Sequence, residues 1–172
     1  TSNITLESGS LDQSGGLFGI LAGGGTLNRM YTTGNISAPE GMMVGGLIGR
    51  LDNLPVSNSY AQGDVDIANG EYIGGLIGQV TSESSVIENS YSVGFIVGTE
   101  DSELVGGLIG NNEEGAVIAN SFWNIETSGQ ETSAGGQGLS TEEMLNQYTY
   151  ESKGWDFETI WNLEAGSYPV LQ

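Results

Sequence analysis

The side chains of this sequence that could carry out catalysis are mainly carboxylates. The chain has 22 Asp and Glu residues but no His and no Cys, so triads with an imidazole base and thiol nucleophiles are excluded. Paired carboxylates can still cleave glycosidic bonds, and the pairings available are Asp64 with Asp66 and Glu100 with Asp101 and Glu103. Both groups lie in polar stretches of variable length, where a solvated acidic surface is the simpler interpretation. We therefore predict no enzymatic activity.

The same carboxylates are the candidate ligands for a metal ion. Oxygen atoms clustered in turns suit Ca²⁺, which takes about six to eight of them. The sequence lacks the Asp-rich loop of EF-hands and the Gly-Gly-x-Gly-x-Asp nonapeptide of calcium-binding β-rolls. We expect no required cofactor, with calcium as the candidate ion. Its candidate ligands form two clusters: Asp64, Asp66 and Glu71, and Glu100, Asp101 and Glu103.

Aromatic residues recur at a regular spacing and could bind a sugar polymer. Four of them return at nearly equal steps along the chain, and we call them the aromatic ladder: Tyr31, Tyr60, Tyr91 and Phe122. Aromatic faces spaced along a sheet can stack on sugar rings. Rings that stack on one another would only stabilise the fold, and we favour this second interpretation.

The aromatic ladder belongs to a repeat that also contains paired glycines. The block Gly-Gly-Leu-Ile-Gly occurs at 45–49, 74–78 and 106–110, with a modified copy at 15–19. The glycine pairs start at positions 15, 45, 74 and 106, so the repeat has a nearly constant period. A repeat of this length with two or three strands fits one coil of a parallel β-helix, whereas a propeller blade needs four strands in about 40–50 residues. The sequence predicts an all-β parallel β-helix (β-solenoid) of about four coils.

Equivalent residues of successive coils should stack about 4.7–4.9 Å apart. We expect the first glycine of each pair at a corner with positive φ, where a Cβ would be costly. The second glycine should lie where coils approach closely, and the leucine after it should point into the coil. The predicted sets are Gly45, Gly74 and Gly106; Gly46, Gly75 and Gly107; and Leu17, Leu47, Leu76 and Leu108.

A second corner is predicted at the asparagines two positions before the aromatic residues, which are Asn58, Asn89 and Asn120. Asparagine tolerates the left-handed region, and its side chain can hydrogen-bond to the copy in the next coil. With a corner there, the next residues, Ser59, Ser90 and Ser121, turn inward and the aromatic ladder points outward. Without a corner, simple alternation buries the tyrosines. The sequence leaves both arrangements open.

These blocks resemble the GLUG repeat of large bacterial surface proteins, adhesins and the N-terminal regions of some secreted immunoglobulin A proteases. The segments Ser121–Asn124, Gly154–Phe157 and Ser167–Leu171 look like the module that closes many such arrays. The resemblance covers about residues 15–172. It implies a part of a larger surface protein and does not specify a ligand.

The repeats divide the chain into three parts. Residues 1–14 should form a partial first coil or N-terminal edge, residues 15–123 the repeats (15–44, 45–73, 74–105 and 106–123), and residues 124–172 a mixed C-terminal cap. Ser140 and Glu143 have the spacing of a capping box, which predicts one short helix over Thr141–Gln147. Three tryptophans are expected to cover the open end of the stack, whose strand edges are otherwise unpaired: Trp123, Trp155 and Trp161.

The charge and hydropathy of the chain limit its partners. A net charge of −19 disfavours nucleic acid, and no run approaches the roughly 18 apolar residues of a membrane span. We expect a non-catalytic structural or adhesive module, extracellular or at the cell surface, that acts as a spacer or a binding surface. Its partners would be other domains of the same large protein, with a polysaccharide or a host or partner-cell surface as the candidate ligand. The alternative is a carbohydrate-binding or carbohydrate-cleaving β-helix domain.

Overall fold

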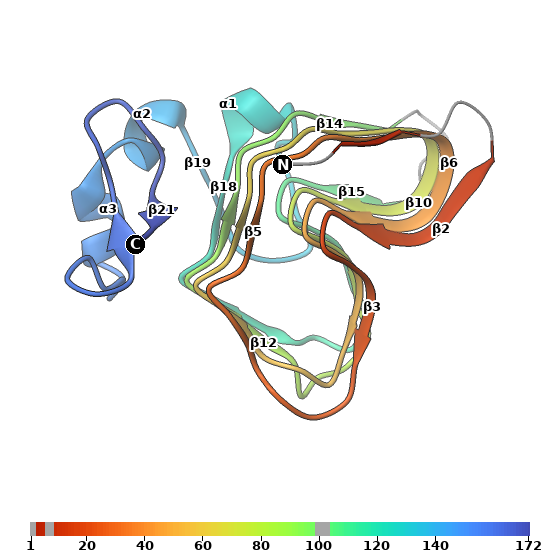
Figure 1. Cartoon of the computed structure of the whole chain (residues 1–172), viewed down its shortest axis with the longest axis horizontal. Coiled ribbons are helices and arrows are strands. Elements are labelled where there is room, and N and C mark those ends of the chain that lie inside the picture. The colour runs from red at the N-terminus through yellow and green to blue at the C-terminus, as the bar shows by residue number, and fades with distance from the viewer. Residues whose placement is uncertain (1–2, 6–8, 99–103) are drawn as a thin grey trace.

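The computed structural model of the chain is a parallel β-solenoid of about four turns, as the sequence predicts. It describes residues 3–5, 9–98 and 104–172. Figure 1 looks down the stack, so that equivalent strands of successive coils lie over one another. Each full coil passes through four parallel sheets before it rises to the next level.

The first two sheets lie on either side of the paired glycines. The six-stranded sheet contains β1 (Ile4–Thr5), β2 (Ser10–Gly15), β6 (Ile36–Gly45), β10 (Val65–Gly74), β14 (Ile96–Val97) and β15 (Leu104–Gly106). The sheet after the glycines contains β3 (Phe18–Ala22), β7 (Ile48–Asp52), β11 (Ile77–Val80) and β16 (Ile109–Asn112).

The other two parallel sheets lie on either side of the predicted asparagine corner. The sheet before it contains β4 (Leu27–Asn28), β8 (Val56–Ser57), β12 (Val86–Glu88) and β17 (Val117–Ala119). The sheet after it contains β5 (Tyr31–Thr32), β9 (Tyr60–Ala61), β13 (Tyr91–Ser92), β18 (Phe122–Asn124) and β19 (Gln137–Leu139).

The stacking register follows the sequence repeat. The paired strands place Gly15, Gly45, Gly74 and Gly106 side by side. The backbone N–H of Leu47 donates to the carbonyl of Leu76 (2.9 Å), and that of Leu76 donates to the carbonyl of Leu108 (2.8 Å). These three leucines are fully buried, which confirms the inward ladder for them, whereas Leu17 in the first coil is 43% exposed.

The predicted reason for the first glycine of each pair is wrong. Gly45, Gly74 and Gly106 are not among the glycines with positive φ. A Cβ on Gly45 would instead clash with the carbonyl oxygen of Ile48 and lie 2.6 Å from the backbone nitrogen of Gly78. The requirement is therefore one of space at the turn between two sheets, because the backbone of the same turn and that of the next coil fill the place of a side chain.

The second glycine of each pair does lie where coils meet closely. A Cβ on Gly46 would clash with the carbonyl oxygen of Gly75, and one on Gly75 would clash with that of Gly107. A Cβ on Gly107 would clash with the ring of Trp123. These contacts confirm the close approach that the sequence predicts.

Two buried apolar clusters fill the coil. The larger one lies between the sheets of β7, β8 and β9 and includes Leu47, Val56 and Leu76. The second lies inside the curve of the six-stranded sheet and includes Ile36, Ile67 and Ile73. Figure 1 shows the strands of that sheet bending back on themselves to form one lobe of the coil.

The C-terminal segment contains three helices rather than the single predicted one. They are α1 (Ile125–Ser128), α2 (Thr141–Met144) and α3 (Gln147–Glu151), and they are followed by the antiparallel pair β20 (Trp161–Asn162) and β21 (Val170–Leu171). The capping box of Ser140 and Glu143 is present at α2. The predicted helix to Gln147 ends early because the Asn146 side chain accepts from Tyr148 N–H and starts α3.

Candidate functional site

The corner that positions the aromatic ladder is built from asparagine in the left-handed region. Asn58, Asn89 and Asn120 have φ of 49°, 48° and 48°, so the predicted corner is confirmed. The predicted hydrogen bonds between the equivalent corner asparagines of successive coils are wrong. Asn58 donates instead to Oδ1 of Asn28 (2.9 Å), which is the equivalent of Ser57 in the first coil. Asn89 Oδ1 is buried without a partner among the described residues.

The serines after the corner turn inward and link the coils. Ser90 Oγ accepts from the backbone N–H of Ser59 (3.2 Å) and donates to the carbonyl of Glu88 (2.8 Å). The equivalent contacts are made by Ser121 to Ser90 N–H and to the carbonyl of Ala119. Ser59 and Ser90 are fully buried and Ser121 is 2% exposed, so each hydroxyl satisfies backbone groups that water does not reach.

The aromatic ladder forms as a stack of parallel rings. The ring centroids of Tyr31 and Tyr60 are 5.0 Å apart, and those of Tyr60 and Tyr91 are 5.1 Å apart, with interplanar angles of 16° and 11°. Phe122 pairs in register with Tyr91 on the next strand. The rings of Tyr60, Tyr91 and Phe122 belong to a different apolar cluster from the coil interior, so they lie outside the coil, as the corner requires.

The cap covers most of this ladder, so the rings point away from the coil interior but are largely shielded from solvent. Tyr60, Tyr91 and Phe122 are 3%, 0% and 1% exposed, and only Tyr31, in the first coil, is open to solvent at 52%. Trp161 packs against Tyr60 and Tyr91 at 6.0 and 6.2 Å between centroids. A sugar polymer therefore has access to one of the four predicted stacking rings.

The predicted position of the cap needs correction. Trp155 and Trp161 are buried, at 4% and 0% exposure, but they lie against the side of the stack rather than over its end. In Figure 1 the helices α2 and α3 and the strand β21 stand beside the sheet of β5 and β18. The large apolar surface that needed covering was the row of rings outside the coil.

Trp123 alone among the tryptophans acts at the end of the stack. It pairs with Ser92, which pairs with Ala61 in the preceding coil. The position that holds a small residue, Ala61 or Ser92, in the earlier coils therefore holds a tryptophan in the last coil. Its ring joins the coil interior, and its Nε1 donates to the carbonyl of Gln130 (3.0 Å). Residues 132–139 then continue across this end, with Gly107 N–H donating to the carbonyl of Thr132 (2.9 Å).

Burial changes the acidity of the enclosed tyrosines. Desolvation raises the pKa of Tyr60 to about 12, and it raises the pKa values of Tyr91 and Tyr150 well above the ordinary range. The Tyr91 hydroxyl also donates to the carbonyl of Pro169 and accepts from Nε2 of Gln62 (2.8 Å). These phenols are neutral hydrogen-bonding groups at neutral pH and are unsuited to act as bases.

The first predicted calcium cluster contains a residue with a different role. The Asp64 carboxylate accepts from the backbone N–H of Phe95 in the next coil (2.8 Å), and Asn35 Oδ1 accepts from Asp64 N–H (2.9 Å) in the same way. Asn3 Oδ1 accepts from Asn35 N–H (3.0 Å). This corner therefore links coils through Asn and Asp side chains, a role that the repeat of Gly-Asn at 34–35 and Gly-Asp at 63–64 could have indicated.

The other two members of the first predicted calcium cluster do not form a grouped site among the described residues. They are Asp66 and Glu71, and both lie on the long strand β10. Within residues 3–5, 9–98 and 104–172, no three Asp, Glu, His or Cys residues are grouped so that they could hold an ion. Glu100, Asp101 and Glu103 lie outside the described residues. Calcium binding stays a prediction.

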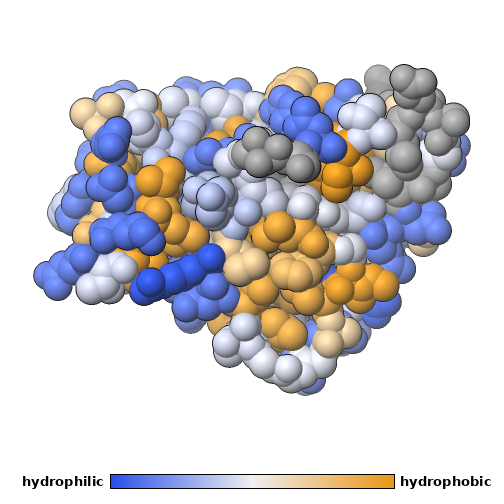
Figure 2. Space-filling view, viewed as in Figure 1, coloured by the Kyte–Doolittle hydropathy of each residue, from blue (hydrophilic) through white to orange (hydrophobic). Residues whose placement is uncertain are grey.

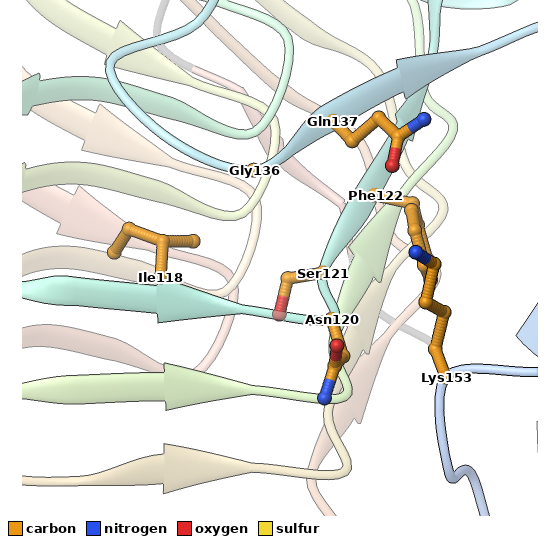
Figure 3. Close-up of a pocket in the computed structure, with 7 residues that line it drawn as sticks. All are labelled: Ile118, Asn120, Ser121, Phe122, Gly136, Gln137 and Lys153. Atoms are coloured by element: carbon orange, nitrogen blue, oxygen red, sulfur yellow. The ribbon is translucent and has the colours of Figure 1, made fainter.

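A polar pocket of about 180 Å³ lies between the end of the stack and the cap. Figure 3 shows Lys153 extending from the cap toward Phe122, with Gln137 on one side and the corner of Asn120 and Ser121 on the other. Ile118 and Gly136 complete the lining. The pocket could hold one small polar group, and no sequence pattern pointed to it because its residues come from three separate segments.

The sequence also missed the residues that fix the cap in place. Asn124 is fully buried. Its Oδ1 accepts from the N–H groups of Glu126 and Thr127 in α1, and its Nδ2 donates to Thr141 Oγ1 (2.9 Å) and to Tyr168 Oη (2.8 Å). Tyr150, also fully buried, packs edge-on against Phe122 at 5.6 Å between centroids. Neither residue belongs to a repeat, so periodicity gave no signal for them.

Comparison with known proteins gives a limited match. A protein of Evansella cellulosilytica named "Putative Gly-rich membrane protein" is 40% identical to this chain over 92 residues, which are 52% of this chain and 10% of that protein. The chain thus spans about a tenth of the length of this relative. No family model and no solved structure matches the chain. In the part of the chain that the structure describes, the helices are too short and too polar to cross a membrane.

Proposed function

We propose that the chain is a non-catalytic structural module of the GLUG-repeat kind, which serves as a rigid spacer in a longer bacterial surface protein. The observation that carries this proposal is the burial of the aromatic ladder beneath the cap. The repeated residues contact the neighbouring coils or the cap, so the repeat supports a stiff stack rather than a repeated ligand site. A stack in which each coil contacts mainly its neighbours is suited to hold other domains apart.

The relative supports the proposed location. Its name describes a membrane protein, and this chain corresponds to a small part of its length. A module of this kind would lie at the cell surface, where its partners are the other domains of the same polypeptide. The net charge of −19 keeps such a surface soluble and argues against nucleic acid as a partner.

The absence of catalysis is part of the proposal. Asp64, the best placed carboxylate of the first predicted pair, binds a backbone N–H of the next coil. Its neighbour in sequence, Asp66, is exposed on the strand β10. Glycoside hydrolysis needs two carboxyl groups that face one substrate, and these two have separate surroundings.

Carbohydrate binding is the second candidate, and the polar pocket beside Lys153 is the observation that favours it. Lysine ammonium and amide groups donate hydrogen bonds to hydroxyl and carboxylate oxygens. Lys153 is the only lysine of the chain, and Gln137 lines the same space. A site of this size would accept one acidic or neutral sugar unit and not a long polymer.

The deciding experiment is a glycan array with the intact chain, with and without calcium, together with an assay for sugar release. The spacer proposal expects no binding above that of an unrelated acidic protein and no released sugar. Saturable binding that Lys153→Ala abolishes, while the loop variant Glu83→Gln retains it, would replace the spacer with a carbohydrate-binding role. Release of sugar fragments would overturn the non-catalytic assignment.

A further inference from the structure

The two ends of the stack differ in how they are closed. At the C-terminal end, Trp123 and residues 132–139 lie over the last coil. At the N-terminal end, the strands β3, β4 and β5 are the terminal members of their sheets, and each presents an edge. We call the surface formed by these three strands, the turns between them and the turn of Gly16 and Leu17 before β3 the N-terminal face.

Apolar side chains gather on the N-terminal face. Leu17, Ile20 and Tyr31 are 43%, 54% and 52% exposed, whereas the equivalent Leu47 and Tyr60 in the second coil are 0% and 3% exposed. Figure 2 looks onto this end of the stack and shows a broad apolar area over the first coil. The exposure arises because no coil lies beyond the first one in the described structure.

The N-terminal face is also free of carboxylates. No Asp or Glu occurs from position 13 to position 39, although the chain has 22 of them. Every other interval between successive acidic residues is less than half as long. Proteins usually protect a solvent-exposed strand edge with charged residues, since a bare edge pairs with other strands. The cores of interfaces are depleted of charge in the same way, and Arg29 is the one charged residue from position 13 to position 39.

The first coil repeats the contacts that join the coils above it. Leu17 N–H donates to the carbonyl of Leu47 (3.1 Å), as Leu47 donates to Leu76. Tyr31 stacks on Tyr60 as Tyr60 stacks on Tyr91. The N-terminal face is thus the same surface that forms each coil-to-coil interface inside the stack, and its glycine, leucine and tyrosine positions follow in the same order.

We infer that the N-terminal face is a docking surface for one further parallel coil of the same repeat type, supplied by a preceding part of a longer polypeptide. This inference rests on the proposed spacer function. A coil with the same cross-section would stack an aromatic ring on Tyr31, a small residue on Gly16 and a leucine on Leu17. Its strands would pair with the edges of β3, β4 and β5.

A second copy of the chain fits this surface less well. Stacking the C-terminal end of one copy on the N-terminal face of another is blocked by Trp123 and residues 132–139. Two N-terminal faces can meet only through a two-fold axis perpendicular to the stack. That axis brings the outline of one coil against the mirror-reversed outline of the other. The strands of the four sheets differ in length, with 10, 5, 2 and 2 residues in β6, β7, β8 and β9, and Figure 1 shows two unequal lobes. The strands of the two copies would therefore not coincide.

The test adds the missing coil. Ile4 pairs with Ile36, and Asn3 accepts from Asn35 as Asn35 accepts from Asp64, so a copy of residues 35–63 joined directly before Asn3 continues the register. The proposal expects one cooperative urea transition with a higher midpoint and an m-value larger by roughly one sixth, in proportion to the added chain. Nitration of Tyr31, measured by peptide mass spectrometry, should fall severalfold, because the added tyrosine would stack on the open face of Tyr31 as Tyr31 stacks on Tyr60.

The matched control carries Asp in the added copies of Leu47 and Val56, whose originals are fully buried. Tyr31 should then react as in the unextended chain, and the added segment should be cut by protease. The inference is overturned if the unmodified added coil behaves like this control. It is also overturned if the unextended chain forms a stable dimer that Ile20→Asp dissociates, because a second copy then covers the face. Sugar binding at Lys153 would overturn the spacer role without changing either result.

Discussion

Replacing Trp161 by alanine tests whether the cap and the stack form one folding unit. Trp161 is fully buried and comes from β20, far from the coils in sequence. Its ring lies 4.5 Å from that of Trp155, 6.0 Å from that of Tyr60 and 6.2 Å from that of Tyr91, measured between centroids. The indole therefore joins the cap to two successive coils.

The expected loss can be estimated from these contacts. Truncating a buried aromatic residue to alanine costs about 3–5 kcal/mol, and each aromatic pair contributes about 0.5–1.5 kcal/mol beyond its buried area. With three ring neighbours, the free energy of unfolding should fall by an amount in the upper part of that first range. The Nε1 contact to Asn58 is long at 3.4 Å and adds little. Trp161→Phe keeps a ring and should therefore recover more than half of the loss.

Urea unfolding followed by circular dichroism and by tryptophan fluorescence measures this loss. The control is Tyr148→Ala, which removes an aromatic ring from the same cap where it is 71% exposed and should change stability by no more than about 0.5 kcal/mol. The two optical transitions should coincide in the parent chain. A loss below about 1 kcal/mol for Trp161→Ala, well under the usual range for a buried aromatic, or equal effects of the two alanine variants, would refute the packing argument.

Three further perturbations follow from the coil contacts and the buried phenols. Gly45→Ala places a Cβ against the carbonyl of Ile48 and the backbone of the next coil, so the free energy of unfolding should fall by about 3 kcal/mol, at the upper end for overpacking. Gly24→Ala, with nothing within 4 Å of the added Cβ, should leave stability unchanged or raise it by up to about 1 kcal/mol. Thermal melts of both variants check this difference. Ser90→Ala leaves a buried backbone N–H of the preceding coil without its acceptor and should cost about 1–3 kcal/mol in urea unfolding, and a smaller loss would mean that water replaces the hydroxyl. Because burial raises the pKa of Tyr60 to about 12, the unfolded chain loses this phenol proton at lower pH than the folded one, so stability is full below about pH 10 and falls as pH rises toward 12. Tyrosinate absorbance should then appear together with the loss of circular dichroism, and titration of the enclosed rings in the still-folded chain near pH 10 would contradict the burial of the ladder.

The coil architecture could be predicted from the sequence because each coil needs the same residue types at the same positions. Two glycines, an inward leucine, a left-handed asparagine and an inward serine return at a near-constant step, and all of them occupy the predicted places. Their reasons were harder to predict. Gly45 looked like a positive-φ residue, yet its constraint is the space taken by the carbonyl of Ile48 in its own turn and by the backbone of the next coil. Sequence spacing alone does not separate the two causes.

The cap could not be placed from the sequence because its residues occur once. The capping box at Ser140 correctly started a helix, but the position of that helix depends on Asn124, whose amide joins Thr141 and Tyr168 across the cap. Asp64 shows the same limit. Its carboxylate was assigned to calcium by composition, while its hydrogen bond to Phe95 N–H follows from the coil geometry.

The position of the cap follows from which surface most needs cover. A solenoid with a left-handed corner before each tyrosine must place a row of large rings outside its coil, and that row grows with every repeat. The end of the stack has a fixed area, which a single indole, Trp123, and one crossing segment can close. The side therefore offers the larger apolar area to a segment rich in Trp and Tyr, and burying it contributes roughly 25 cal/mol per Å². It follows that the cap stabilises several coils at once, and that Tyr31, the ring it leaves open, marks the end at which the stack can continue.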